Sequence, residues 1–253
     1  MAYTNSSLVS YTKLSPNHSG QRTHAIDRIT PHCVVGQCSV ETLGNIFLPT
    51  SRQASCNYGI GVDGRVGMYV EEKNRSWCSS SSANDQRAIT IECASDATEP
   101  YAFKDVVYQK LITLCVDICK RNGKKKLLWL GDKDKTLSYE PKSDEMVLTV
   151  HRWFANKSCP GNWMYARMGD LAEKVTAQLG GSSGSTGTSA TQLYRVRKTW
   201  TDSKSQKGAY KILSNAKKCA DANPGYSVFD VNGVNIYTPN TSCLLYTSDA
   251  ADD

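Results

Sequence analysis

The distribution of apolar residues along the chain predicts strands that alternate with helices. Residues 24–36 (HAIDRITPHCVVG) and 88–95 (AITIECAS) are short apolar runs, which are typical of buried strands. Residues 57–70 (NYGIGVDGRVGMYV) have the pattern of a β-hairpin, and Asp63-Gly64 is a favourable turn between its two strands.

Two longer segments have the period of an amphipathic helix. In residues 101–123, one apolar stripe is formed by Phe103, Val107, Leu111, Leu114, Cys115 and Ile118, and Gly123 ends the helix. In residues 162–180, the same spacing is kept by Met164, Met168, Leu171, Val175 and Leu179, with Gly180 at the C-terminal cap. Strands in alternation with helices predict an α/β fold, in which helices flank a mixed central β-sheet.

A low-complexity segment divides the chain. Residues 181–191 contain only Gly, Ser, Thr and Ala, which is the composition of a flexible linker. We therefore expect one domain over residues 1–180 and a small second domain over residues 192–238. Residues 239–253 fit neither domain and resemble the translation of a sequencing adapter, so we interpret them as the artefact of a truncated reading frame.

The small second domain is predicted to be a βαββ module. Residues 193–200 (LYRVRKTW) predict a strand, and the stretch LSNAKKCADANPG predicts a short helix that starts at Ser214 and stops before Pro224-Gly225. Residues 226–237 (YSVFDVNGVNIY) predict a hairpin, because Asn232-Gly233 suits a type I′ turn.

Charge is unevenly distributed between the domains. The chain has a net charge of +6, and residues 192–238 contain eight lysines and arginines against three aspartates. A basic module suggests an anionic partner: a nucleic acid, a membrane surface or an anionic cell-wall polymer. The interleaved basic and aromatic residues of the first strand also suit a single-stranded nucleic acid. A solvated basic face without a partner is an equally good interpretation.

The overall composition is that of a globular protein, with 40% hydrophobic and 21% charged residues. No apolar run approaches the ~20 residues that cross a membrane, and the N-terminal segment lacks the features of a secretory signal. The chain contains ten scattered cysteines. Without a secretion signal these are expected to be reduced thiols, and we interpret Cys115 and Cys119 as core packing rather than as a metal pair.

Three residues have the chemistry of a catalytic zinc site. His32 lies at the end of a predicted strand, while His151 and Cys159 flank a loop that Pro160-Gly161 turns sharply. A catalytic zinc takes three protein ligands and leaves its fourth position open for water. This spacing is only moderately specific, and a hydrogen-bonded core histidine with a packed cysteine is the alternative interpretation.

Glu92 interrupts an apolar strand, and burial of an unpaired carboxylate is costly. Such a group is usually paired with a cation, or it has a raised pKa and a chemical role. In a zinc hydrolase that role is general base toward the attacking water and general acid toward the leaving amine. Lys157 could stabilise the oxyanion on the attacked carbonyl, although a solvated lysine or a Lys–Glu pair explains it equally well.

Four stretches together resemble the N-acetylmuramoyl-L-alanine amidases of phage endolysins and bacterial autolysins, whose fold is shared with peptidoglycan recognition proteins. They are ITPHCVVG, NYGIGVDGRV, RSWCSSSSANDQRAITIECAS and HRWFANKSCPG. The resemblance covers nearly all of the first domain and implies one Zn²⁺ bound by His32, His151 and Cys159. It also implies catalysis by Glu92 and Lys157, with a zinc-bound water as the nucleophile and Glu92 as general base and acid.

The implied reaction is hydrolysis of the amide between N-acetylmuramic acid and the first L-alanine of the stem peptide. Trp77 and Asn84 are expected to contact the substrate. The chain departs from the family pattern at Cys78, where many members have His, so a preference for one muropeptide does not carry over. The second domain resembles the wall-binding repeat modules of clostridial phage amidases and is similar in outline to SPOR-like domains.

The expected partners are the peptidoglycan of a Gram-positive wall and, through the second domain, anionic wall polymers. We expect no nucleic acid partner and no membrane insertion. An endolysin-like protein would remain in the host cytoplasm until holin-dependent release, whereas an autolysin would act outside the cell. Two alternatives stay open: a peptidoglycan-binding protein of the same fold without activity, and a nucleic acid-binding protein with a structural zinc.

Overall fold

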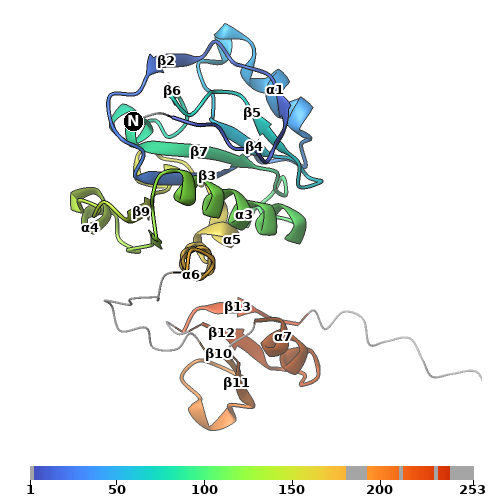
Figure 1. The fold of residues 1–253 in the computed structure, drawn as a ribbon. Coiled ribbons are helices and arrows are strands. Elements are labelled where there is room, and N and C mark those ends of the chain that lie inside the picture. Colours follow the sequence, from blue (N-terminus) through green and yellow to red (C-terminus); the bar gives the residue numbers. More distant parts are fainter. Residues whose placement is uncertain (1–2, 181–192, 211–212, 231–232, 240–253) are drawn as a thin grey trace, which may run out of the picture. The chain divides into compact units, whose positions relative to one another are not determined.

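The computed structural model describes residues 3–180, 193–210, 213–230 and 233–239. The chain forms two compact units, residues 1–184 and 185–253 (Figure 1). The predicted linker, nearly all of the predicted tail and one residue of the predicted type I′ turn lie outside the described residues. No helix in the described part of the chain is both long enough and apolar enough to span a bilayer.

The first unit contains a seven-stranded mixed sheet in the order β1-β5-β4-β7-β3-β9-β8. In that order the strands are Val9–Thr12, Val66–Met68, Tyr58–Ile60, Ala88–Cys93, Arg28–Cys33, Glu145–Leu148 and Lys126–Leu128. Neighbours run parallel except β4 and β5, which form the hairpin predicted around Asp63-Gly64. A separate antiparallel pair consists of β2 (His18–Gln21) and β6 (Asn74–Ser76). The mixed sheet with its flanking helices confirms the predicted fold class.

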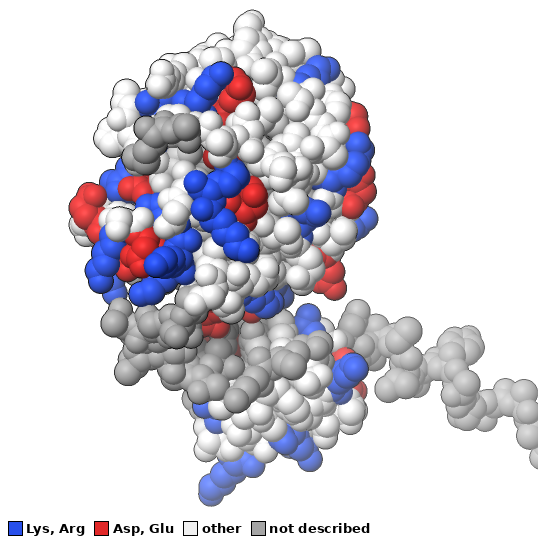
Figure 2. All heavy atoms as spheres, in the orientation of Figure 1, with Lys and Arg blue, Asp and Glu red and all other residues white. Residues whose placement is uncertain are grey.

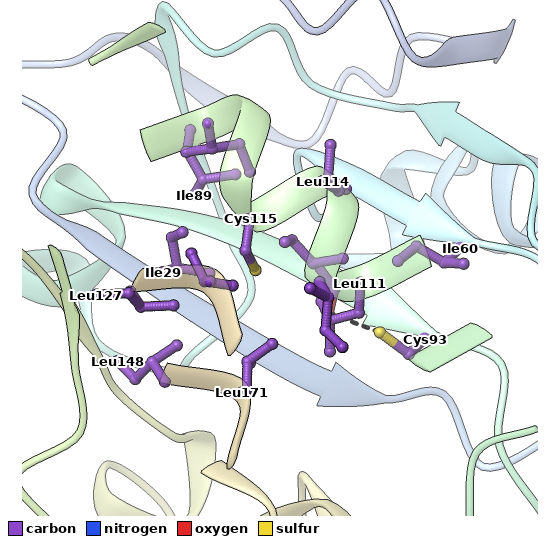
Figure 3. Packing of buried hydrophobic residues seen from close by; sticks show 14 of the residues in the cluster. Ile29, Ile60, Ile89, Cys93, Leu111, Leu114, Cys115, Leu127, Leu148 and Leu171 are labelled. Atoms are coloured by element: carbon purple, nitrogen blue, oxygen red, sulfur yellow. Dashed lines mark hydrogen bonds between the residues drawn. The ribbon is translucent and has the colours of Figure 1, made fainter. Parts of the chain in front are cut away.

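The helices of the first unit pack on both faces of the sheet. They are α1 (Val40–Phe47), α2 (Ser82–Arg87), α3 (Asp105–Arg121), α4 (Lys133–Ser138), α5 (Gly161–Tyr165) and α6 (Met168–Gln178), with 3-10 turns η1 (Thr50–Arg52) and η2 (His151–Trp153). Helices α3 and α6 share one large apolar cluster with the sheet (Figure 3). The whole predicted stripe of α3 lies in this cluster, and Gly123 follows the helix with φ +68°. The predicted helix is therefore confirmed over Asp105–Arg121, whereas residues 101–104 precede it.

Strands β3 and β7 divide their side chains between two environments. Ile29 of β3 and Ile89 and Ile91 of β7 belong to the apolar cluster with α3 and α6. Because side chains alternate along a strand, His32 and Glu92 point to the opposite face. Glu92 therefore does not interrupt a uniformly apolar strand; it belongs to the polar set of an alternating one.

Residues 162–180 form two helices, α5 and α6, rather than the single continuous helix that their spacing suggests. Ala166 and Arg167 separate the two helices. The guanidinium of Arg167 lies over the ring of Trp163 at 3.9 Å and donates to the Trp163 carbonyl at 2.9 Å. Four of the five predicted apolar side chains are nevertheless buried, because the chain resumes on the same face after the break; they are Met164, Met168, Leu171 and Val175. The fifth, Leu179, follows the end of α6 and is half-buried.

The second unit is a four-stranded antiparallel sheet in the order β11-β10-β12-β13, packed against one helix. Its elements are β10 (Tyr194–Arg197), the 3-10 turn η3 (Ser203–Ser205), β11 (Gly208–Tyr210), α7 (Leu213–Asp221), β12 (Ser227–Phe229) and β13 (Asn235–Tyr237). Val196, Ala216, Ala220 and Val228 form its fully buried core. The predicted strand, helix and final two strands are present, and β11 is an additional edge strand too short to be recognised in the sequence.

The nine cysteines in the described part of the chain are free thiols. Cys115 and Cys119 are completely buried on α3 within the large apolar cluster. Their interpretation as core packing is therefore confirmed.

Candidate metal centre and catalytic pocket

Three neighbouring strands direct polar residues to one end of the sheet. Strands β3 and β7 run parallel, with His32 directly opposite Glu92. Strand β9 lies on the other side of β3 and leads through Thr149 to His151; the hydroxyl groups of Thr149 and Thr30 are 2.7 Å apart. Because parallel strands end at the same edge, residues far apart in sequence meet there.

The loop after β9 brings His151 and Cys159 to His32. The backbone N–H of Arg152 donates to the carbonyl of Cys159 at 3.1 Å, which closes the loop. Cys159 Sγ lies 3.2 Å from His32 Nδ1, and the ring centroids of His32 and His151 are 5.1 Å apart. One donor atom from each of the three side chains lies within 4.8 Å of the others. These residues are therefore close enough to bind one metal ion.

The donor set fits zinc. Zinc binds thiolate sulfur at ~2.3 Å and imidazole nitrogen at ~2.0 Å with tetrahedral geometry, so two such donors lie about 3.5 Å apart. The 3.2 Å separation of His32 Nδ1 and Cys159 Sγ is close to that distance.

The protonation states of these side chains also fit metal binding. Burial, and then the neighbouring His151, lowers the pKa of His32 well below its ordinary value. Burial, and then Lys157, lowers the pKa of His151. Both rings are therefore neutral at pH 7, as metal ligation requires. Burial raises the pKa of the Cys159 thiol, so a bound cation would have to displace its proton.

Ser80 orients the His151 ring. Its backbone lies in the left-handed region, with φ +62°, and its Oγ is 2.9 Å from His151 Nε2. A hydrogen bond at one ring nitrogen selects the other for ligation. His151 Nδ1 is therefore the nitrogen that this arrangement offers to a metal.

Glu92 has the properties of a proton carrier. Burial raises the pKa of its carboxyl to about 7, opposed by the charge of Arg52 and by the contact with Cys78. Oε1 lies 3.9 Å from Cys78 Sγ, while Oε2 is buried and has no hydrogen-bond partner among the described residues. A group whose pKa is near the ambient pH can both accept and return a proton.

A pocket of about 610 Å³ lies over Glu92. Trp77, His151 and Lys157 line it together with Glu92. Lys157 is exposed, and the Trp77 indole N–H donates to Ser19 Oγ at 2.6 Å. The structure therefore gathers the predicted catalytic residues and one predicted substrate contact around a single cavity.

Asn84 occupies a different place from the one predicted. Its side chain is fully buried, and its amide group donates to Thr30 Oγ1 at 3.0 Å and to Ser79 Oγ at 3.2 Å. Its carbonyl oxygen accepts from Thr149 Oγ1 at 3.0 Å. Asn84 does not belong to the lining of the pocket. The structure therefore argues against a substrate contact: Asn84 ties together β3, the residue that follows β9 and the loop before α2.

Residues 15–162 match the family model for N-acetylmuramoyl-L-alanine amidases. The chain belongs to this family. The matched segment includes the three candidate metal ligands and Glu92. A search of curated proteins finds no match.

Several solved structures match part of this chain. The AmpD structure is 18% identical, covers 68% of this chain and 99% of its own, and has a TM-score of 0.47. The amidase LysC from Clostridium intestinale URNW is 16% identical, covers 69% and 96%, and has a TM-score of 0.43. The PlyG catalytic domain is 13% identical, covers 70% and 98%, and has a TM-score of 0.45.

Sequence reasoning missed several charged residues of this amidase-family pocket. Arg52 and Arg75 line it. Arg75 precedes Trp77 by two positions, a strand spacing that places both on one face and could have identified it. Asp85 also lines the pocket, and its carboxylate accepts from the backbone N–H groups of Cys78 at 3.0 Å and Ser79 at 3.2 Å. The role of Asp85 in holding the loop that contains Cys78 and Ser79 is visible only in the folded structure.

Proposed function

We propose that this protein is a zinc-dependent peptidoglycan hydrolase that cleaves the amide between N-acetylmuramic acid and the first L-alanine of the stem peptide. The observation that carries the proposal is the convergence of His32, His151 and Cys159 beside Glu92, a carboxyl with a pKa near neutrality at a polar pocket. Membership of the amidase family supports the substrate class.

In the proposed reaction, Glu92 moves the protons. As a carboxylate it takes a proton from the water that attacks the lactyl carbonyl, and as an acid it gives that proton to the alanine nitrogen. A carbon–oxygen bond forms, the carbon–nitrogen bond breaks, and the products are a carboxyl group and a new alanine amine. A zinc ion held by His32, His151 and Cys159 would supply Lewis-acid polarisation.

Lys157 and Trp77 are proposed to act on the substrate. The ammonium of Lys157 is exposed at the pocket, where it can approach the oxyanion that develops on the attacked carbonyl. Trp77 offers an aromatic surface at the same cavity, against which a sugar ring or peptide can pack.

The small C-terminal unit is proposed to anchor the enzyme to the wall. The guanidinium of Arg197 lies 4.9 Å from the centre of the Trp200 ring, and Lys198 and Lys207 lie 5.8 and 5.5 Å from that of Tyr226. Most of the charged residues visible on this unit in Figure 2 are lysine and arginine. Paired cations and aromatic rings suit an anionic wall polymer, and attachment would raise the effective concentration of the catalytic unit at its substrate.

The role is proposed to be endolysin-like, as the resemblance in sequence implies. To test the proposed activity, purified protein would be added to Gram-positive cell walls. The turbidity of the suspension and the appearance of new L-alanine N-termini would be measured with and without a chelator. We expect the walls to clear and new alanine amines to appear. Both effects should be lost when the chelator is added and restored by zinc. Intact walls that carry the protein down on centrifugation would instead indicate a binding protein, and clearing without alanine amines would indicate a different bond.

A further inference from the structure

The pocket contains a second group of metal-ligating atoms. Donor atoms of His32, Cys78 and Glu92 lie within 4.8 Å of one another. Cys78 lines the pocket, its backbone N–H donates to Asp85, and its Sγ lies 3.9 Å from Glu92 Oε1. Thiolate and carboxylate ligands on one zinc lie about 3.5 Å apart, so this pair needs little movement to share an ion.

Two buried atoms in this group have no hydrogen-bond partner within the described part of the chain. They are His32 Nε2 and Glu92 Oε2, and His32 is only 1% exposed. A buried polar atom without a hydrogen-bond partner destabilises the folded protein. A cation ligated by Glu92 would satisfy the carboxylate oxygen that has no protein partner.

We propose that His32, Cys78 and Glu92 form an alternative binding position for a thiophilic divalent ion, in competition with the position formed by His32, His151 and Cys159. This inference rests on the proposed metal centre, since both positions use His32. A neutral imidazole has a single lone pair, so His32 ligates one ion at a time and the two positions exclude each other.

When an ion occupies the alternative position, the protein is metal-bound but inactive. An ion there displaces the Cys78 proton to solvent and takes the Glu92 carboxylate as a ligand. Glu92 then no longer accepts a proton from water, and His151 and Cys159 no longer ligate. Cys78 therefore gives this chain a metal-bound state without turnover.

Cobalt replacement of the metal tests the proposal, because thiolate-to-cobalt charge-transfer absorption reports sulfur ligation without any assay of activity. The wild-type protein is expected to bind one Co²⁺ with this absorption. Cys159→Ser should still bind one Co²⁺ with thiolate absorption but lose hydrolysis. Cys159→Ser/Cys78→Ser should lose the absorption and weaken Co²⁺ binding by ~10-fold or more, since loss of a direct ligand exceeds loss of an outer-shell partner.

The matched control is Cys159→Ser/Cys33→Ser, because Cys33 also contacts Cys159. This variant should keep the thiolate absorption of Cys159→Ser. The proposal is overturned if Cys159→Ser shows no such absorption, or if removal of Cys33 rather than Cys78 abolishes it. A wild-type protein that binds no Co²⁺ would instead overturn the proposed metal centre itself.

A second measurement needs no double variant. In Cys159→Ser, mass spectrometry should show that Co²⁺ slows alkylation of Cys78 by iodoacetamide by ~10-fold or more, as expected of a ligated thiolate. Alkylation of Cys38, a partly buried cysteine on another loop, should not change. Equal alkylation of Cys78 with and without Co²⁺ would overturn the proposal.

Discussion

The two faces of strands β3 and β7 differ in what covers them. On one face, Ile29, Ile89 and Ile91 are fully buried beneath α3 and α6. On the other, His32 and Glu92 lie beside loops that contribute thiols, a second imidazole and an open pocket. The same two strands thus supply stability through one set of alternate residues and chemistry through the other. Substitutions on the two faces should separate these effects.

The largest effect is expected from Glu92→Gln. This change keeps the size of the side chain but removes its ability to accept a proton, so hydrolysis should fall by ~10²–10⁴-fold. Release of alanine amines from purified walls measures the rate, and metal analysis should still find one zinc per chain. The matched control is Glu140→Gln on the exposed surface, which should hydrolyse normally. Full activity of Glu92→Gln would remove this residue from the mechanism.

Ile89→Ala tests the opposite face of the same strand. Ile89 is completely buried, so its truncation should lower the free energy of unfolding by about 2–5 kcal/mol, measured with denaturant. The rate per folded molecule should stay within about two-fold of the wild type at low temperature, because the polar face of β7 is unchanged. A large loss of rate with unchanged stability would mean that the two faces are not separable.

The polar face should also make the stability of the protein depend on pH, because it carries the titratable Glu92. The pKa of Glu92 is about 7 in the folded state against an ordinary 4.5, so the folded protein holds this proton more tightly than the unfolded chain. Metal-free protein should therefore lose ~3 kcal/mol of stability as pH rises from the unfolded-state pKa to the folded-state pKa, and the loss should be complete above the folded-state pKa. Denaturant titrations of metal-free Glu92→Gln at the same pH values should lack that component. Parallel profiles for both proteins would contradict the raised pKa.

The smallest effect is expected from Lys157→Ala. Removal of a buried oxyanion donor costs 10²–10³-fold, and because Lys157 is exposed we expect only a ~10-fold loss of kcat. Zinc content and the free energy of unfolding should not change. Lys133→Ala, which removes an exposed lysine on α4, is the control and should have no effect on kcat. An unchanged kcat for Lys157→Ala would leave that lysine as a solvated surface group.

The local patterns in the sequence predicted the elements that build this site. Apolar runs identified β3 and β7, and the helical stripe identified α3. The break between α5 and α6 was not visible in the sequence, because Met164 and Met168 keep helical spacing across it. Asn84 was wrongly expected to contact the substrate, because its position within a sequence motif does not show the direction in which its side chain points.

By itself, the sequence determined the α/β class, since periodicity is a local property, and its resemblance to a known family indicated the candidate ligands His32, His151 and Cys159. Only the tertiary structure decided that Cys78 lies near Glu92, that Asn84 is buried and that the carboxyl of Glu92 has a raised pKa. These depend on strand register and on the desolvation caused by loops distant in sequence. The distances between these side chains and the desolvation of Glu92 exist only in the folded molecule, so they could not be predicted from the sequence alone.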